Sequence, residues 1–319
     1  MDVLDRFQKI GIIPVVKLEN AKDAAPLAKA LCEGGLPVAE VTFRTDAAAE
    51  SICRMKEACP QMLVGAGTVL TTDQVDAAIK AGSEFIVSPG LNPRIVRYCQ
   101  EKGIPITPGT SSPTDIEQAI ELGLRVVKFF PAEASGGIAK IKAMAAPYTS
   151  MRFMPTGGIN ENNLMDYLRF PKVIACGGSW MVKDALINEG KFDEIRRLTR
   201  EAVDSMLGFE LMHVGINTAD EKEADAVADG FANMFGFSKK TGGASVFAGS
   251  FIEAMKVPYL GQNGHIAIGT NDLARAIYHL ELRGFTTDET TAKYDEKGKM
   301  VAIYMKEQLG GFAIHLLQK

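Results

Sequence analysis

The sequence predicts an α/β protein in which a (β/α)8 barrel is followed by a smaller α+β domain. Between residue 11 and about residue 180, eight short β-rich runs alternate with helical segments. The alternation stops at DSMLGFEL (204–211), and two segments of similar sequence follow it. A chain of 319 residues also exceeds the size at which one hydrophobic core usually stops growing. We therefore expect two domains, over residues 1–207 and 208–319.

The first domain is predicted from its regular order of strands and helices. The eight β-rich runs are IIPVVK, VAEVTF, LVGAGT, FIVSPG, IPITPG, VVKFFP, RFMPTG and VIACGG. Between them lie helical stretches such as NAKDAAPLAKALCEGG and TTDQVDAAIKAG, which begin at Asn or Thr caps and end at Gly. Eight such units with short connections favour a barrel of the TIM type over an open sheet.

The second domain is predicted from an internal repeat. MHVGINTADEKEADAVADGFANMFGF resembles GHIAIGTNDLARAIYHLELRGF, because each has a strand that opens with His, a helix and then Gly-Phe. Short strands follow each copy and end in SFIEAM or GFAIHLL. The repeat predicts paired βαβββ modules.

Composition and charge favour a globular protein with a small-molecule partner. The chain is 46% hydrophobic and 23% charged, with a net charge of −4 and no long run of Lys or Arg. This argues against nucleic acid or a membrane surface as the partner. The N-terminus lacks a cleavage site and no apolar run reaches 18 residues, so we expect a soluble, cytoplasmic protein. Five cysteines without CxxC spacing are expected to be reduced thiols.

Polar side chains stand at strand positions where a barrel interior is usually apolar. Alternation places Glu40 and Arg44 on one face of the second strand, and Lys128 on the opposite face from Val127 and Phe129. The third and seventh strands end with threonines. Five side chains are expected to converge at the C-terminal mouth of the barrel, namely Glu40, Arg44, Thr68, Lys128 and Thr156.

A lysine in a run of Val and Phe has a structural and a catalytic interpretation. In the structural interpretation, Lys128 forms an ion pair with Glu40 that fills the barrel interior and has no other role. Such buried pairs are weak stabilisers, because both ions lose their water. Burial favours an uncharged amine, which attacks a ketone to form a Schiff base. Glu40 is then placed to transfer protons as a general acid/base, and the guanidinium of Arg44 is able to bind a substrate carboxylate through two hydrogen bonds.

Paired glycines end the seventh and eighth strands, in PTGGIN and ACGGSW. Such turns bring backbone N–H groups close to an anion, and these loops are the usual phosphate site of a barrel. The first histidine of the chain is His213, so the barrel offers no imidazole to a metal. Lysine chemistry is therefore favoured over a zinc site, although Mg²⁺ held by carboxylates stays open.

These motifs resemble those of the class I 2-keto-3-deoxy-6-phosphogluconate (KDPG) aldolases, also called 4-hydroxy-2-oxoglutarate aldolases. The resemblance covers residues 1–207 and is carried by EVTFRT (40–45), GAGTV (65–69), SPG (88–90), KFFPAE (128–133), PTGGI (155–159) and GGSW (177–180). It implies a lyase of the Entner-Doudoroff pathway that needs no cofactor, forms homotrimers and cleaves KDPG to pyruvate and glyceraldehyde 3-phosphate. 4-Hydroxy-2-oxoglutarate, cleaved to pyruvate and glyoxylate, is a second implied substrate.

The resemblance also implies a role for each residue of the predicted site. Lys128 would be the Schiff-base lysine, Glu40 the general acid/base and Arg44 the carboxylate clamp. The other implied ligands of the substrate are Thr68 and Thr156, with Gly157, Gly158, Gly178 and Ser179 at the phosphate. The alternative is a phosphate-binding isomerase or epimerase that uses Glu40 alone.

The repeat of the second domain brings four possible metal ligands to matching positions. His213 and His265 stand at strand starts, and Glu253 and His315 lie near the ends of the last strands of the two modules. Such a set suits Zn²⁺, Ni²⁺ or Fe²⁺. The segment resembles the glyoxalase/vicinal oxygen chelate superfamily, although His315 stands where glyoxalase I usually has Glu. Two hypotheses stay open, a metal-dependent enzyme and a binding or oligomerisation module without catalysis.

Overall fold

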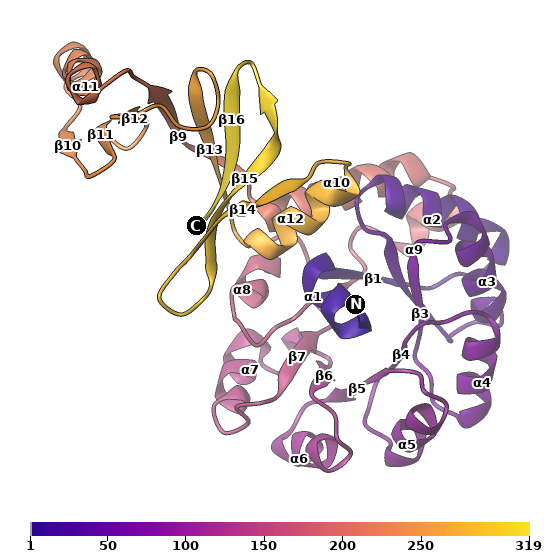
Figure 1. Ribbon diagram of the computed structural model, residues 1–319. Helices are drawn as coiled ribbons and strands as arrows, with labels where there is room; N and C mark the ends of the chain where they lie inside the picture. Colours follow the sequence, from indigo (N-terminus) through magenta and orange to yellow (C-terminus); the bar gives the residue numbers. More distant parts are fainter. Residues whose placement is uncertain (1) are drawn as a thin grey trace. The chain divides into compact units, whose positions relative to one another are not determined.

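The computed structural model describes residues 2–319 and divides into two compact units, Met1–Met206 and Leu207–Lys319. Figure 1 shows a ring of strands surrounded by helices in the first unit, and a large sheet with two helices in the second. Within residues 2–319, no helix is long and apolar enough to cross a bilayer.

Eight parallel strands form the barrel of the first unit. They are β1 Ile12–Val16, β2 Val38–Thr42, β3 Leu63–Gly67, β4 Ile86–Ser88, β5 Ile106–Thr110, β6 Val126–Phe129, β7 Arg152–Pro155 and β8 Cys176–Gly178. Their order is β7-β6-β5-β4-β3-β2-β1-β8, and all pairs along it are parallel. Isolated bridges, Phe153 with Val173 and Thr156 with Gly177, join the two ends. The predicted barrel is confirmed.

Helices alternate with the strands, and some of them begin at a residue whose side chain caps the first turn. They are α1 Val3–Ile10, α2 Ala24–Glu33, α3 Ala48–Ala58, α4 Thr72–Lys80, α5 Pro93–Glu101, α6 Pro113–Glu121, α7 Gly137–Ala145, α8 Leu164–Leu168, α9 Asp184–Asn188 and α10 Phe192–Leu207, with short 3-10 turns η1 Ala21–Asp23 and η2 Glu133–Ser135. Thr71 caps α4, and Ser112 with Asp115 forms a capping box on α6.

Helix α1 was not anticipated from the sequence. Asp2 caps its start by accepting a hydrogen bond from the N–H of Leu4. Phe7 of α1 packs edge-on against Phe85, the residue before β4, with ring centroids 4.8 Å apart. The helix therefore lies against the N-terminal end of the barrel and leaves the C-terminal end to the loops.

The second unit is one sheet of eight strands with two helices. Its elements are β9 Glu210–Asn217, α11 Glu221–Phe235, β10 Lys239–Thr241, β11 Ser245–Ala248, β12 Ile252–Met255, β13 Gly264–Thr270, α12 Leu273–Leu282, β14 Thr287–Tyr294, β15 Met300–Leu309 and β16 Phe312–Gln318. The sheet order is β10-β11-β12-β9-β13-β16-β15-β14. Strand β9 is parallel to β12, β13 is parallel to β16, and β9 joins β13 antiparallel.

This topology gives the central strands two different faces. Because side chains alternate along a strand, His265 and His315 lie on one face of β13 and β16, while Ile268 and Ile314 lie on the other. Helix α11 packs small residues on its half of the sheet, where Ala224, Ala228, Val246, Ala248 and Ala254 form a core cluster. The sheet thus carries one polar cluster and separate apolar cores.

Candidate active site

Lys128 and Glu40 form an ion pair inside the barrel. Lys128 is on β6 and Glu40 on β2, and Nζ lies 3.3 Å from Oε1. The two residues are 5% and 0% exposed. Among the described residues, the second carboxylate oxygen of Glu40 has no hydrogen-bond partner. Since buried polar atoms normally have partners, an unpaired oxygen beside a buried amine is typical of a site that receives a ligand.

Glycines on neighbouring strands make room for the polar side chains. A Cβ at Gly67 would lie 2.3 Å from Oε1 of Glu40, and one at Gly177 would lie 2.3 Å from Oγ1 of Thr156. The barrel interior therefore admits these side chains only where the adjacent strand has no side chain of its own.

The two predicted threonines follow β3 and β7 at the C-terminal end of the barrel. Thr156 is 5% exposed, and its Oγ1 has no hydrogen-bond partner in the part of the chain that the structure describes. Thr68 has φ +57°, a backbone conformation that residues other than Gly and Asn rarely adopt. Such strain clusters at functional sites.

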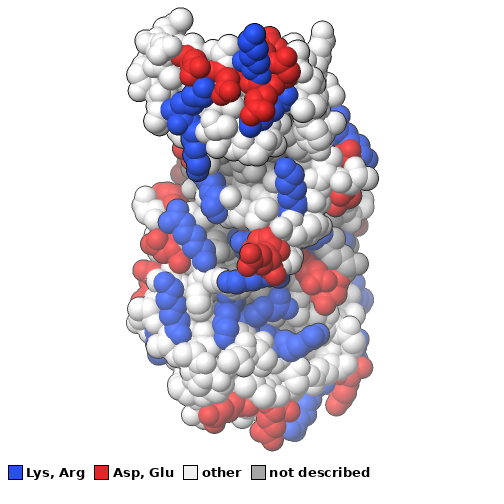
Figure 2. Space-filling model, turned by 60° about the vertical axis from the view of Figure 1, so that its left-hand side comes forward, with Lys and Arg blue, Asp and Glu red and all other residues white. Residues whose placement is uncertain are grey.

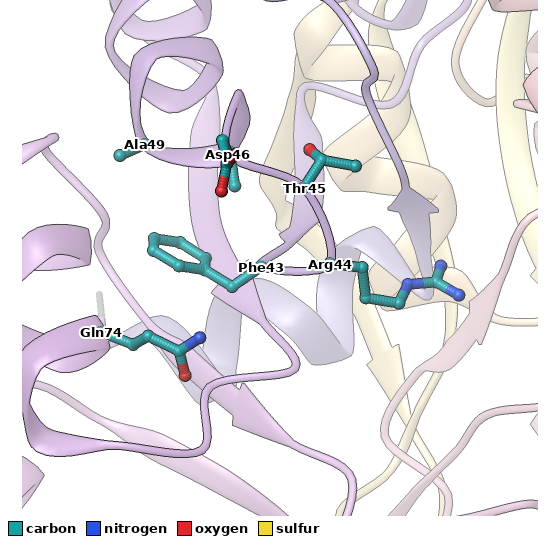
Figure 3. A pocket seen from close by; sticks show the side chains of 7 residues that line it. Phe43, Arg44, Thr45, Asp46, Ala49 and Gln74 are labelled. Carbon is teal, nitrogen blue, oxygen red and sulfur yellow. The ribbon is translucent and has the colours of Figure 1, made fainter.

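Arg44 lies outside strand β2. The prediction extended the alternation of β2 to Arg44, but the strand ends at Thr42 and Arg44 is an exposed loop residue. Its Nε donates a hydrogen bond to Oγ1 of Thr42 at 3.2 Å, so the side chain reaches back toward the strand. Figure 3 shows it extending away from Phe43 and Gln74. These residues border a surface cavity of about 370 Å³, lined by Phe43, Arg44, Thr45, Asp46, Ala48, Ala49 and Gln74.

The glycine pairs form the seventh and eighth loops. Gly157 and Gly158 have φ of 99° and 84°, conformations that favour glycine. The carbonyl of Gly157 accepts a hydrogen bond from the N–H of Glu133 at 3.0 Å, which fixes the loop after β7. Gly178 ends β8 and Ser179 is exposed beside it. On the face drawn in Figure 2, Lys and Arg side chains are interspersed with Asp and Glu side chains.

Sequence reasoning missed Lys17, which directly follows β1. Its ammonium lies 2.9 Å from a carboxylate oxygen of Glu19 and 2.9 Å from one of Asp184, the first residue of α9. Lys17 is therefore a positioned cation on the same side of the barrel as the glycine loops. The signal was present in IIPVVK, whose last residue is a lysine at the C-terminal end of a strand.

Four predicted ligands meet on one face of the sheet in the second unit. They come from four adjacent strands: His213 from β9, Glu253 from β12, His265 from β13 and His315 from β16. The Nε2 atoms of His213 and His265 are 3.1 Å apart, and each lies 3.1 Å from Oε2 of Glu253. Single nitrogen atoms of His213, His265 and His315 all lie within 4.8 Å of one another.

This arrangement is poorly explained by hydrogen bonds alone. Three atoms at the corners of an equal-sided triangle cannot all make straight hydrogen bonds to one another. A metal ion with bonds of about 2.0–2.1 Å holds adjacent ligand atoms about 2.8–3.4 Å apart, which is the separation found here. In addition, Nε2 of His315 is buried without a hydrogen-bond partner among the described residues. The residues present therefore fit a divalent metal.

Burial and neighbouring charges shift the pKa values of this cluster. Burial, with the imidazoles of His265 and His213 nearby, lowers the pKa of His315 to about 3. Burial opposes ionisation of Glu253, but hydrogen bonds from His213, His265 and Ser245 outweigh it and hold the pKa of Glu253 well below its usual value. A neutral imidazole and an ionised carboxylate are the forms that bind metals.

The sequence also did not predict the residues that contact and support the cluster of His213, Glu253, His265 and His315. Ser245 donates a hydrogen bond of 2.6 Å to Oε1 of Glu253, and the ring of Tyr304 stacks on His315 with centroids 4.6 Å apart. A Cβ at Gly215 would lie 2.0 Å from Cε1 of His265. The pairing of Tyr304 with His315 depends on strand register, which the sequence does not reveal.

Comparisons with known proteins concern the barrel. The model of the KDPG and KHG aldolase family matches residues 3–198. A 2-dehydro-3-deoxy-phosphogluconate aldolase of Haemophilus influenzae is 50% identical over 202 residues, which cover 63% of this chain and 95% of the relative. A KHG/KDPG aldolase of Escherichia coli is 41% identical over 193 residues, covering 60% of this chain and 91% of the relative.

The solved structures that are similar to the barrel are also KDPG aldolases. The KDPG aldolase of Legionella pneumophila, described with pyruvate captured at low pH as a covalent carbinolamine intermediate, has a TM-score of 0.61 and 36% identity. It matches 63% of this chain and 98% of its own. The aldolase of Zymomonas mobilis with 3-phosphoglycerate has a TM-score of 0.59 and 40% identity, over 63% of this chain and 94% of its own. The chain belongs to the KDPG and KHG aldolase family through its barrel, residues 3–198.

Proposed function

We propose that the barrel is a class I aldolase that cleaves KDPG to pyruvate and glyceraldehyde 3-phosphate through a Schiff base on Lys128. The observation that carries the proposal is the contact of 3.3 Å between Nζ of Lys128 and Oε1 of Glu40 in the barrel interior. Relatives at 40–50% identity are named as this aldolase, which supports it. The covalent carbinolamine of the Legionella relative supports attack by an amine.

The proposed reaction needs a nucleophile and a proton carrier in contact with each other. Nζ of Lys128 attacks the keto carbon, and loss of water from the carbinolamine gives a protonated Schiff base. The electrons of the bond between carbons 3 and 4 move to this nitrogen as Glu40 takes the proton of the hydroxyl on carbon 4. Glyceraldehyde 3-phosphate leaves, and the remaining enamine is protonated and hydrolysed to pyruvate and free Lys128.

The other predicted residues would hold the two ends of the substrate. Arg44 would bind the carboxylate, and Thr68 and Thr156 would contact the substrate near the reacting carbons. The phosphate would lie on the seventh and eighth loops, against Gly157, Gly158, Gly178 and Ser179. The same site would also accept 4-hydroxy-2-oxoglutarate, which lacks the phosphate, to give pyruvate and glyoxylate.

Borohydride trapping tests the proposal directly. Reduction in the presence of pyruvate is expected to add a pyruvate-derived mass to the peptide that contains Lys128. The variant Lys142→Met, which removes an exposed lysine of α7, is a matched control and should label normally. Labelling at another residue, or none, contradicts the proposal. Release of pyruvate from KDPG, followed with a coupled dehydrogenase, separates an aldolase from the alternative isomerase or epimerase.

We also propose that the protein is a homotrimer, as the family resemblance implies. Light scattering on a sizing column should then give three times the chain mass of 34.4 kDa. A mass of one or two chains would contradict this.

For the second unit we propose a divalent metal site of the glyoxalase/vicinal oxygen chelate type, in paired βαβββ modules. His213, Glu253, His265 and His315 would hold Zn²⁺, Ni²⁺ or Fe²⁺. The proposal is supported by the separations of 3.1 Å among His213, His265 and Glu253. A bound ion would act as a Lewis acid on an oxygen ligand, while Tyr304, which stacks on His315, would hold that imidazole in place.

Metal analysis of the full chain tests this site. About one equivalent of metal is expected after incubation with excess Zn²⁺ and dialysis, and His265→Ala should remove it, whereas Glu296→Gln, at an exposed position beyond β14, is the control. Less than about 0.1 equivalent per chain would reject the metal site and favour a binding or oligomerisation module.

A further inference from the structure

Two asparagines of the loop after β7 bind the carbonyl of Gly158. Nδ2 of Asn163 donates a hydrogen bond to it at 3.0 Å, and Nδ2 of Asn160 donates a second at 3.2 Å. Oδ1 of Asn163 accepts from the N–H of Asn160 at 2.9 Å, and Oδ1 of Asn160 accepts from the N–H of Asn162 at 2.9 Å. Because a carbonyl only accepts and a backbone N–H only donates, these partners fix the orientation of both side-chain amides.

The peptide on the other side of Gly158 is fixed by the backbone. The carbonyl of Gly157 accepts a hydrogen bond of 3.0 Å from the N–H of Glu133. In a trans peptide the C=O of one residue and the N–H of the next point in opposite directions. The N–H of Gly158 therefore points away from Glu133. Gly158 is exposed, and within residues 2–319 its N–H has no hydrogen-bond partner.

Gly158 needs these bonds because it is the kind of residue that has the most conformational freedom. Its φ is 84°, and it has no side chain to restrict its backbone. With the carbonyls of Gly157 and Gly158 both bound, the two peptide planes that flank the residue are held. An exposed N–H without a partner is then ordered before an anion arrives, which lowers the entropic cost of binding that anion.

We propose that Asn163 positions Gly158 for the phosphate of the substrate, and thereby sets the preference of the barrel for phosphorylated over unphosphorylated keto acids. This inference rests on the proposed aldolase function. Asn163 makes the shorter of the two bonds to Gly158 and also holds the N–H of Asn160, so its loss frees the loop most. The cost of ordering Gly158 is then subtracted from the binding of phosphate.

Steady-state kinetics with two substrates test the proposal. Asn163→Ala should raise KM for KDPG at least about tenfold and leave kcat within about twofold, because the phosphate is bound alike in the ground state and the transition state. For 4-hydroxy-2-oxoglutarate, which has no phosphate, both constants should stay within about twofold of the parent values. An unchanged KM for KDPG, or an equal loss with both substrates, would overturn the proposal.

The same loop provides a matched control. Asn162 is exposed, and its side chain makes no hydrogen bond among the described residues, so Asn162→Ala should change neither substrate. Borohydride trapping of pyruvate on Lys128 needs no phosphate and should proceed at the parent rate in both variants, which checks that they are folded. A parent chain that traps no pyruvate rejects the proposed function. A parent chain that cleaves KDPG with the same KM as Asn163→Ala rejects this inference alone.

Discussion

The barrel and the second unit both bury ionisable side chains, but they balance the charge differently. In the barrel, the ammonium of Lys128 lies against the carboxylate of Glu40, so the chain supplies both charges. In the second unit, the carboxylate of Glu253 lies 3.1 Å from the imidazoles of both His213 and His265, and the ring of His315 lies beside those two rings. Transfer of a proton from the ammonium to the carboxylate frees the amine of Lys128 for attack on a ketone, whereas a carboxylate among imidazoles has no amine to offer.

The largest expected effect comes from removing the barrel amine. Lys128→Met should lower the rate of KDPG cleavage by about 10⁴-fold or more, because no other group replaces the nucleophile. It should leave metal binding by the second unit unchanged. The coupled pyruvate assay and metal analysis measure both on one preparation. Cleavage at the parent rate would end the Schiff-base mechanism.

Lys128→Met also leaves Glu40 buried without its partner, which should cost about 3–5 kcal/mol of stability. The double variant Lys128→Met with Glu40→Gln should regain part of this stability and none of the activity. Denaturant unfolding of the two variants separates loss of the fold from loss of the chemistry.

Glu40→Gln is expected to give a smaller loss of activity than Lys128→Met. The amide keeps the shape of the side chain but cannot accept a proton, so kcat should fall about 10²- to 10⁴-fold. Pyruvate should still be trapped on Lys128 by borohydride, although more slowly. An unchanged kcat would show that another group moves the proton.

The cluster of the second unit should respond to His265→Ala and the barrel should not. Loss of one ligand is expected to weaken Zn²⁺ binding by at least about 100-fold, as judged by competition with a chromogenic chelator. KDPG cleavage should stay within about twofold of the parent rate, because the substituted residue lies outside the barrel. A parallel loss of both properties would contradict the separation of the two sites.

The smallest expected effect is on stability. Gly215→Ala places a Cβ 2.0 Å from the ring of His265, so the imidazole must move or the strand must shift. We expect a loss of about 1–3 kcal/mol in the free energy of unfolding of this unit. Gly230→Ala on α11, where a Cβ has open space, should instead be neutral or stabilising. Chemical denaturation of both variants provides the measurement.

Much of the barrel could be predicted because parallel strands obey local rules. Apolar runs marked the eight strands, and capping residues marked helices between them. The alternation of side chains along a strand predicted that Glu40 and Lys128 point into the barrel. Arg44 was placed wrongly on the strand, because alternation cannot reveal where a strand ends. Tyr304 was not found, since its surroundings depend on the register of distant strands. The sequence identified groups able to react, but not the contacts that support them.

Gly67 on β3 makes the residue types at two positions on adjacent strands depend on each other. With 2.3 Å between a hypothetical methyl group and Oε1 of Glu40, residues 40 and 67 compete for the same space. An engineer who wants to reshape this interior must therefore change them together. A smaller acid such as Asp at 40 would free volume for Ala at 67, and would draw the carboxylate back from Lys128.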